Sequence, residues 1–322
     1  MKKYFPILII VIVIIGIAIW INQPNKKQNG ELKKVSIRLE WVHQAQFAGF
    51  YVADKKGFYQ DRGIDVTINP GGVDFPAVQM VASNSDDFGL EEGDRILEAR
   101  EKDVPVVALA TIYRKNPTLF FSLKNSGITK AEDFVGKKVG TFPDVQVLLS
   151  KMLERAGVSE SRVEIVPVKY DITPLLTGEI DVWPGYAINE PILAEEQGYE
   201  VNRIWPSDYG INSYSMTLFT SEKLIREKPD LVRNFVEATI QGWNYAYEHP
   251  DEAVEITLGY SDQLNREHET KMMQASLELL KPDNKPIGYM SKQVWEDMQG
   301  IFLDEPINLD NLFTNDFLPK HP

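Results

Sequence analysis

The sequence predicts an α/β protein with two lobes joined by two crossing strands. Strand-like and helix-like segments alternate along residues 35–113 and again along residues 137–205. Two further strand-like segments, at residues 118–128 and 213–224, each lie beside the change from one set to the other. Regular alternation of this kind is typical of sheets that helices cover. We therefore expect residues 31–121 and 220–322 to form lobe 1, and residues 122–219 to form lobe 2.

The first set of elements predicts a parallel sheet. Alternating or continuous apolar residues indicate strands at 35–41, 64–69, 87–90 and 104–113. Helical spacing indicates helices at 46–56, 76–82 and 93–102, with Gly57 as a C-cap and Pro76 in a first turn. Strands that alternate with helices in this order usually run parallel.

The second set repeats the pattern, and the last part of the chain is mainly helical. We expect strands at 137–142, 163–168 and 200–205, and a short helix followed by a strand within 171–186. Helices are predicted at 145–156 and 190–197. From residue 221 to about residue 301, apolar residues recur at i, i+3 and i+4, which predicts further helices.

The N-terminal residues predict export with a membrane anchor. Lys2 and Lys3 precede an apolar run from Phe5 to Ile21, and residues 24–30 form a polar linker. As a helix, the run is long enough, at roughly 25 Å, to cross a bilayer marginally. The lysines favour a cytoplasmic N-terminus and a body outside the membrane. No clear A-x-A cleavage site is present, which favours an anchor over a removed signal peptide.

Composition excludes several classes of function. The formal net charge is −13, whereas a nucleic-acid surface needs clustered Lys and Arg. The chain has no cysteine, which excludes disulfides, thiolate metal sites and a cysteine nucleophile. Its four histidines, His43, His249, His268 and His321, are scattered without metal-ligand spacing. We expect neither a metal nor a cofactor.

A two-lobed α/β protein places its ligand in the cleft between the lobes and closes around it by a hinge motion. The carboxyl ends of the strands open onto that cleft. Residues that follow predicted strands should therefore converge there. They are Trp41, the pair Gly71–Gly72, the pair Leu90–Glu91, Tyr113, Phe142 and the segment Trp183–Tyr186.

From residue 35 to residue 249 the chain resembles the thiamine-pyrimidine-precursor (ThiY-like) solute-binding proteins of ABC transporters. The matching pieces, in order, include WVHQAQFAGFYVA, KGFY, GIDV, SDDFGL, DFVGKKVG, GEIDVW and YAINEP. The resemblance implies a periplasmic-binding-protein type II fold and capture of a small solute for an ABC permease. The versions HQAQFAGFY and YAINEP also resemble extracellular sensor domains of signalling proteins, which leaves a sensory ligand-binding module as an alternative.

The same fold is used by pyridoxal-phosphate-dependent pyrimidine synthases, and the sequence departs from them at three points. Those enzymes carry a lysine directly after the DFGL piece, where this chain has Glu91, and a histidine where this chain has Arg95. They also carry cysteines for iron, which this chain lacks. A Schiff base needs an amine and that iron site needs thiols, so we expect a protein that is not an enzyme.

The resemblance and the strand ends together give the expected ligand, a flat heteroaromatic solute. A thiamine pyrimidine precursor of the hydroxymethylpyrimidine or formylaminopyrimidine type is expected, with riboflavin or another flat heterocycle as the alternative. Trp41 and Tyr186 are expected to stack on it, while polar side chains read its edges. The expected ligand-binding residues are Trp41, His43, Gln46, Gly71, Gly72, Glu91, Tyr113, Tyr186, Asn189 and Glu190.

Each of these residues also has a purely structural interpretation. Trp41, with Phe47, Phe50 and Tyr51, could be core packing, and His43 could satisfy a backbone group. Gly71 and Gly72 could form only a turn instead of offering N–H groups to a polar ligand group. Asn189 and Glu190 begin a predicted helix, where a capping Asn and an early Glu are common.

Overall fold

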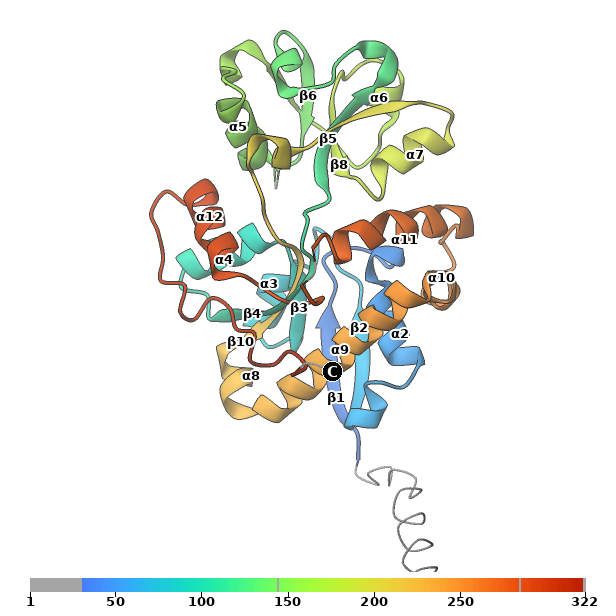
Figure 1. The fold of residues 1–322 in the computed structure, drawn as a ribbon, viewed down its shortest axis with the longest axis vertical. Coiled ribbons are helices and arrows are strands. Elements are labelled where there is room, and N and C mark those ends of the chain that lie inside the picture. The colour runs from blue at the N-terminus through green and yellow to red at the C-terminus, as the bar shows by residue number, and fades with distance from the viewer. Residues whose placement is uncertain (1–30, 144, 284, 321–322) are drawn as a thin grey trace, which may run out of the picture.

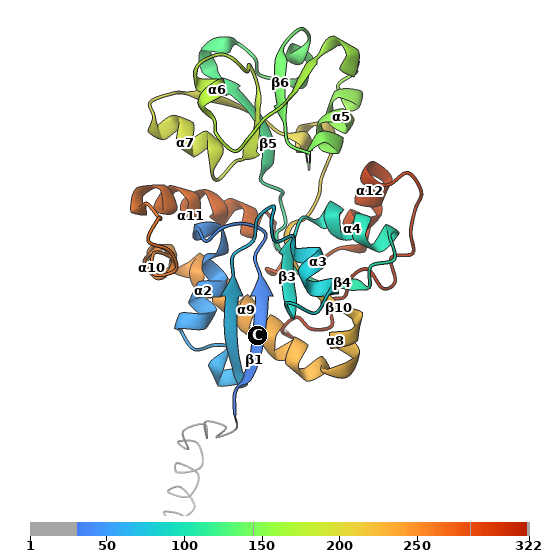
Figure 2. The ribbon, with the colours of Figure 1, turned by 180° about the vertical axis from the view of Figure 1, so that it is seen from behind.

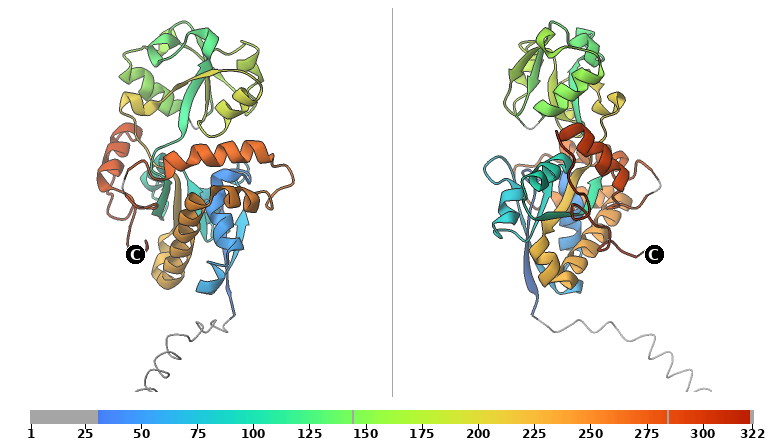
Figure 3. Two further views of the ribbon diagram at one scale, coloured as in Figure 1. Left: turned by 45° about the vertical axis from the view of Figure 1, so that its right-hand side comes forward. Right: turned by 90° about the vertical axis from the view of Figure 1, so that its left-hand side faces the viewer.

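The computed structural model describes residues 31–143, 145–283 and 285–320, and it divides them into two lobes (Figure 1). The larger lobe lies below the smaller one in this view, and two chain segments run between them (Figures 1 and 3). The predicted anchor, Phe5 to Ile21, and the linker lie outside the described residues. Within the described residues, no helix has the length and apolar character needed to span a membrane.

The larger lobe contains a five-stranded sheet of order β2-β1-β3-β10-β4. Strands β1, β2 and β3 run parallel, whereas β10 runs antiparallel to both of its neighbours. The four strands of the first predicted set, β1 to β4, therefore share one direction, as expected. The departure is β10, which was expected to cross between the lobes and instead enters this sheet antiparallel, from the cleft end, after the chain returns from the other lobe. The strands are β1 (Lys33–Arg38), β2 (Ile64–Asn69), β3 (Phe88–Glu91), β4 (Val106–Tyr113) and β10 (Ser215–Ser221).

Helices cover both faces of this sheet. Successive strand residues point to opposite faces, so Leu218 joins the core beneath α2 and α9 while Phe219 joins the core beneath α3, α4 and α12. The buried residues of α4 and α9 recur at the predicted helical spacing. The helices are α2 (Ala48–Lys55), α3 (Ala77–Ala82), α4 (Gly93–Glu101), α8 (Glu222–Glu227), α9 (Pro229–Glu248), α10 (Pro250–Thr257), α11 (Arg266–Leu280) and α12 (Lys292–Phe302).

The smaller lobe has an antiparallel sheet of order β8-β5-β9 and a parallel pair, β6 with β7. Its strands are β5 (Thr118–Leu123), β6 (Lys138–Thr141), β7 (Glu164–Pro167), β8 (Trp183–Tyr186) and β9 (Val201–Ile204), and its helices are α5 (Gln146–Arg155), α6 (Thr173–Leu176) and α7 (Glu190–Glu196). Short 3-10 helices occur at Ala45–Phe47, Gln60–Arg62, Lys124–Ser126, Ala131–Phe134, Glu160–Arg162 and Pro206–Tyr209. Two apolar clusters fill this lobe.

The chain passes between the lobes just before the two strands that were expected to cross. Strand β5 pairs only within the smaller lobe's sheet, and β10 pairs only within the larger lobe's sheet. The connections are residues 114–117 and 205–214, which lie outside both sheets. We propose that the lobes divide in these connections, a few residues before the divisions predicted from the sequence.

Most of the aromatic residues near the first strand belong to the core. Phe47, Phe50 and Tyr51 are fully buried, and Phe50 meets Trp243 of α9 edge-on at a ring-centroid distance of 5.9 Å. The predicted helix at 46–56 begins as a 3-10 turn and continues as α2 from Ala48. Core packing thus explains this group of aromatic residues, with the exception of Trp41.

Helices α2 and α9 approach each other closely through two glycines. A Cβ added at Gly242 would lie 2.2 Å from the Gly49 carbonyl oxygen, and one added at Gly49 would lie 2.2 Å from Cδ2 of Trp243. Neither distance is compatible with an intact contact. The absence of a side chain at both positions therefore sets the spacing of the two helices that cover β1.

We predict that Gly242→Ala lowers the free energy of unfolding by about 1–3 kcal/mol, as overpacking does. Gly300→Ala is the matched control, because Gly300 lies in α12 with no other atom within 4 Å of an added Cβ. That change should raise the free energy of unfolding by about 0.5–1 kcal/mol through helix propensity. Chemical denaturation of both variants measures the difference, and an equal effect of the two would contradict the proposed close contact.

Candidate functional site

A cleft of about 420 Å³ lies between the lobes. The larger lobe lines it with the residues after β1 and with the end of β3 and the start of α4. The smaller lobe contributes the residues after β6, the loop after β7, the end of β8 and the start of α7. The carboxyl ends of strands from both lobes therefore meet at one cavity, which is the usual place for a ligand in α/β sheets.

Aromatic rings from both lobes form one wall of the cleft. The ring of Trp41, in the larger lobe, lies 4.7 Å from that of Tyr170, in the smaller lobe. Tyr170 in turn stacks on Phe142 at a centroid distance of 4.4 Å. Tyr170 is 52% exposed and Trp41 is half-buried, so ring surface remains open to a ligand. Such a surface suits a flat aromatic ring, because offset or tilted ring pairs attract beyond the burial of their area.

Tyr186, at the end of β8, joins the two lobes through hydrogen bonds. Its hydroxyl donates to Glu92 Oε1, and Ser215 Oγ donates to the same oxygen at 2.7 Å. Asn116, in a connection between the lobes, donates from Nδ2 to Glu92 Oε2 at 2.9 Å. Glu92 is thus held by donors from β8, β10 and the connection.

Glu190 and Asn189 are fixed in the opposite part of the cleft, at the start of α7. Glu190 Oε2 accepts the backbone N–H of Tyr186 at 2.7 Å, and Glu190 Oε1 accepts Asn189 Nδ2 at 2.9 Å. Asn189 makes no side-chain capping bond to α7, so the capping interpretation is wrong for it. Both side chains instead hold the end of β8 in position.

A second contact between the lobes lies beside Asn189. The ring of His268, in α11, is 3.0 Å from Asn189 Oδ1 through Nε2 and 3.1 Å from Glu196 Oε2 through Nδ1. Lys271, one turn further along α11, reaches Glu196 Oε1 at 3.2 Å. Figure 2 shows α11 along the upper edge of the larger lobe, with α7 of the smaller lobe above it. These bonds join the two lobes beside the cleft, between α11 and the region of α7.

The lining of the cleft is rich in acidic residues. Arg95 is the one Lys or Arg side chain among the described lining residues, and it forms a bidentate ion pair with Glu98. One cation therefore lies among five carboxyl groups of the described lining, and its charge partly opposes the rise in the pKa of Asp94. Those carboxyl groups are Glu40, Glu91, Glu92, Asp94 and Glu190.

Burial raises the pKa values of these carboxyl groups. Burial, with the negative charge of Asp94 and Glu91, raises the pKa of Glu92 to about 8. Burial raises the pKa of Asp94 to about 6 and also raises that of Glu190. Burial and the charges of Glu92 and Glu91 raise the pKa of Glu40 well above its ordinary value. Near neutral pH the cleft therefore holds protons on some of its acids.

The structure brings most of the expected ligand-binding residues to this cleft. Three of them lie elsewhere. His43 bonds Tyr51 OH through Nδ1 at 2.9 Å and does not line the cleft. Tyr113 is fully buried and donates to Ser276 Oγ at 2.9 Å. The N–H of Gly71 donates to the Trp41 carbonyl at 2.8 Å, so it is not offered to a ligand. The lining members are Trp41, Gln46, Gly72, Glu91, Tyr186, Asn189 and Glu190.

Sequence reasoning missed Glu40, Tyr170 and Asn116. Glu40 directly precedes Trp41 at the end of the same strand, so its position was itself a signal. Tyr170 follows β7, another strand end that opens onto the cleft. Asn116 lies in a connection between sheets, where no strand pattern marks a residue. No group of three His, Asp or Glu residues among the described positions is arranged to hold a metal ion.

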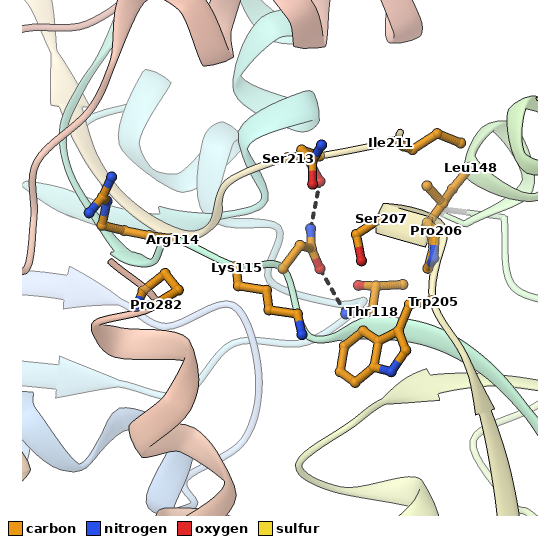
Figure 4. A pocket seen from close by; sticks show the side chains of 12 residues that line it. Arg114, Lys115, Thr118, Leu148, Trp205, Pro206, Ser207, Ile211, Ser213 and Pro282 are labelled. Atoms are coloured by element: carbon orange, nitrogen blue, oxygen red, sulfur yellow. Dashed lines mark hydrogen bonds between the residues drawn. The ribbon is translucent and has the colours of Figure 1, made fainter. Parts of the chain in front are cut away.

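A smaller pocket of about 250 Å³ lies beside the connections (Figure 4). Asn116 there donates to Ser213 Oγ at 2.8 Å and accepts the Thr118 N–H at 2.8 Å, so it joins both connections. The Lys115 ammonium lies 4.3 Å from the ring centroid of Trp205. Figure 4 shows Lys115, Trp205 and Ser213 around this pocket. We assign this pocket to the hinge.

Solved structures identify the class of fold. The chain is similar to the periplasmic aliphatic sulphonate binding protein SsuA of Escherichia coli, with a TM-score of 0.66 and 13% identity over 85% of this chain and 86% of that one. A protein of Bordetella bronchiseptica gives a TM-score of 0.68 with 18% identity, over 90% and 97% of the chains. The predicted type II periplasmic-binding-protein fold is confirmed.

The chain belongs to the NMT1/THI5-like family, whose model matches residues 44–253. It is 28% identical to the riboflavin-binding protein RibY of Chloroflexus aurantiacus, over 89% of this chain and 87% of that protein. It is 27% identical to the formylaminopyrimidine-binding protein of Halalkalibacterium halodurans, over 91% and 93%. A 4-amino-5-hydroxymethyl-2-methylpyrimidine phosphate synthase of Legionella pneumophila is 24% identical over 90% and 93%. The family predicted from the sequence is confirmed, and its relatives include both binding proteins and synthases.

The raised pKa values predict how stability depends on pH. A carboxyl whose pKa is higher in the folded than in the unfolded protein binds more protons when folded, so stability falls as pH rises between the two pKa values. For Glu92 this window runs from about 4.5 to about 8. We predict that the melting temperature of the ligand-free protein falls as pH rises from 5 to about 8, and that Glu92→Gln makes this fall shallower. Differential scanning calorimetry measures it, and an unchanged slope in the variant would contradict the assignment.

Proposed function

We propose that the protein is an extracytoplasmic solute-binding protein that captures a flat nitrogen heterocycle, of the thiamine-pyrimidine-precursor type, between its lobes. The observation that carries the proposal is the composition of the cleft, which combines aromatic rings from both lobes with carboxyl groups at the strand ends. Rings provide the face of a site for a planar ligand. Carboxyl groups provide acceptors for its exocyclic amine.

Specific residues have distinct roles in this proposal. Trp41 and Tyr186 cover the faces of the ligand ring, and Tyr170 closes the cleft beside Trp41. Glu190 accepts a hydrogen bond from an exocyclic amine, since each of its oxygens already accepts one bond and can accept another. Asn189 is a positioning residue, because it holds Glu190 and contacts His268. Closure of the lobes removes the ligand from water.

Two relatives support different members of the same ligand class. The formylaminopyrimidine-binding relative supports a pyrimidine, and the riboflavin-binding relative supports a larger ring system. A volume of about 420 Å³ also favours the larger ligand. The strong negative charge of the cleft favours an amine-bearing pyrimidine. We take the pyrimidine as the proposal and riboflavin as the second candidate.

A role as a synthase is disfavoured by the residues at the cleft. Glu91 occupies the place directly after Phe88–Leu90 where those enzymes carry the amine that a Schiff base requires. Acidic residues also surround this place, which opposes a phosphate-bearing cofactor. We therefore propose a binding protein that is not an enzyme.

Delivery to an ABC permease outside the cytoplasm is the remaining part of the proposal. A ligand-binding component of an ABC-type import system from Staphylococcus aureus has the same fold, with a TM-score of 0.67 at 12% identity. The apolar run at Phe5 to Ile21 supports anchoring at the membrane. A sensory module that acts through a signalling partner uses the same cleft and differs only in what the closed form contacts.

The function is tested by calorimetric titration of the full-length protein with 4-amino-5-hydroxymethyl-2-methylpyrimidine, its formylamino relative and riboflavin. We predict binding of an aminopyrimidine. Trp41→Ala should weaken that binding by about 1–3 kcal/mol, the value of one stacked ring, which is roughly tenfold to more than a hundredfold. Trp41→Phe should retain much of the affinity, because a ring remains to stack.

Tyr199→Ala is the matched control, since Tyr199 is 38% exposed and does not line the cleft. Its affinity should equal that of the unmodified protein. A loss of folding stability of about 3–5 kcal/mol in Trp41→Ala, as for a core aromatic residue, with unaltered affinity, would remove Trp41 from the site. Failure of all three solutes to bind would reject the proposed ligand class.

A further inference from the structure

One carboxyl oxygen in the cleft has no partner. Glu40 Oε2 is inaccessible to solvent and forms no hydrogen bond, whereas Glu40 Oε1 accepts from Gln46 Nε2. Buried carboxyl oxygens are rarely left without a partner, since they lose their hydration and gain no hydrogen bond in return. Glu40 also lines the cleft itself. An unpaired polar atom at this position requires an explanation.

The orientation of Glu40 is fixed by neighbouring amides. Gln44 Nε2 donates to Gln46 Oε1, which leaves Gln46 Nε2 to donate to Glu40 Oε1. The Gln46 carbonyl oxygen lies 3.4 Å from the Tyr113 hydroxyl, which places this turn against the core. Because Oε1 is held as an acceptor, a proton on this carboxyl group belongs on Oε2.

The charged surroundings keep a proton there. Glu91, which ends β3, and Glu92, which precedes α4, both lie near Glu40. The hydroxyl of Tyr186, from β8, also approaches the Glu40 carboxyl, and Tyr113 of β4 lies nearby. Burial and the two carboxylates accordingly raise the pKa of Glu40 well above its ordinary value. A neutral acid at this place, on a residue that lines the cleft, is a hydrogen-bond donor.

We propose that Glu40 is a second residue that reads the ligand, and that its neutral carboxyl donates from Oε2 to a ring nitrogen or carbonyl oxygen of the bound heterocycle. This inference rests on the proposed function. It assigns the ligand class more narrowly, as a heterocycle with an acceptor on one edge and an amine on another.

The two edges are separated by the length of one tyrosine side chain. Glu190 bonds the backbone N–H of Tyr186, whereas the Tyr186 hydroxyl lies at Glu92, close to Glu40. A ring stacked on Tyr186 would therefore lie between Glu190 and Glu40.

The test compares Glu40→Gln with Glu40→Met in titrations with 4-amino-5-hydroxymethyl-2-methylpyrimidine and riboflavin. Gln keeps a neutral group that can both accept from Gln46 and donate to the ligand, so affinity should stay within about threefold. Met has similar length and no hydrogen-bonding group, so affinity should fall at least tenfold. Gln46→Met measures the effect of losing the Gln46 bond alone, and melting curves confirm that each variant is folded.

A pH series separates a ligand-reading role from a structural one. In the unmodified protein, affinity should fall as pH rises through the raised pKa of Glu40, because Glu40 then loses the proton that it donates. In Glu40→Gln this component should disappear. Equal affinity of Glu40→Met and the unmodified protein, or an equal loss in Glu40→Gln and Glu40→Met, would overturn the inference while the proposed function stands. Failure of the unmodified protein to bind either solute would overturn both.

Discussion

The site depends on one constraint, which is that several carboxyl groups are withdrawn from water into a single cleft with almost no compensating positive charge. Buried charges are costly unless they are paired or neutralised. Three hydrogen-bond donors offset this cost at Glu92, and two donors offset it at Glu190. Glu40 has one donor on one oxygen and none on the other. In the proposed function, a ligand supplies the hydrogen-bonding partner that Glu40 Oε2 lacks.

The same bonds that satisfy the acids also couple the lobes. Tyr186 reaches from the smaller lobe to Glu92 in the larger, and His268 and Lys271 reach from α11 to α7. Individual exposed ion pairs contribute little, at about 0–1 kcal/mol, so this set biases the lobes toward closure without locking them. Asn116 connects the hinge to the same network, because it bonds both Glu92 and Ser213. Ligand contacts and lobe closure are therefore two aspects of one hydrogen-bonded system.

Much of the fold follows from local pattern, whereas the site depends on contacts between distant residues. Apolar periodicity located α4, α9 and β4 because these elements bury a continuous face. It could not show that β10 runs antiparallel between β3 and β4, since pairing direction is set by where the chain re-enters the lobe. Strand ends correctly indicated Trp41, Glu91 and Tyr186. Tyr113, which also ends a strand, is buried, because its side chain points toward α11 rather than toward the cleft.

Native mass spectrometry of the protein purified with its bound small molecule tests the central claim most directly, since it needs no prior choice of ligand. The account predicts a flat nitrogen heterocycle without phosphate, released when the lobes are opened by denaturation. The acidic lining and the aromatic wall both require this class. Release of an anionic or aliphatic molecule, such as an alkanesulfonate, would contradict the account.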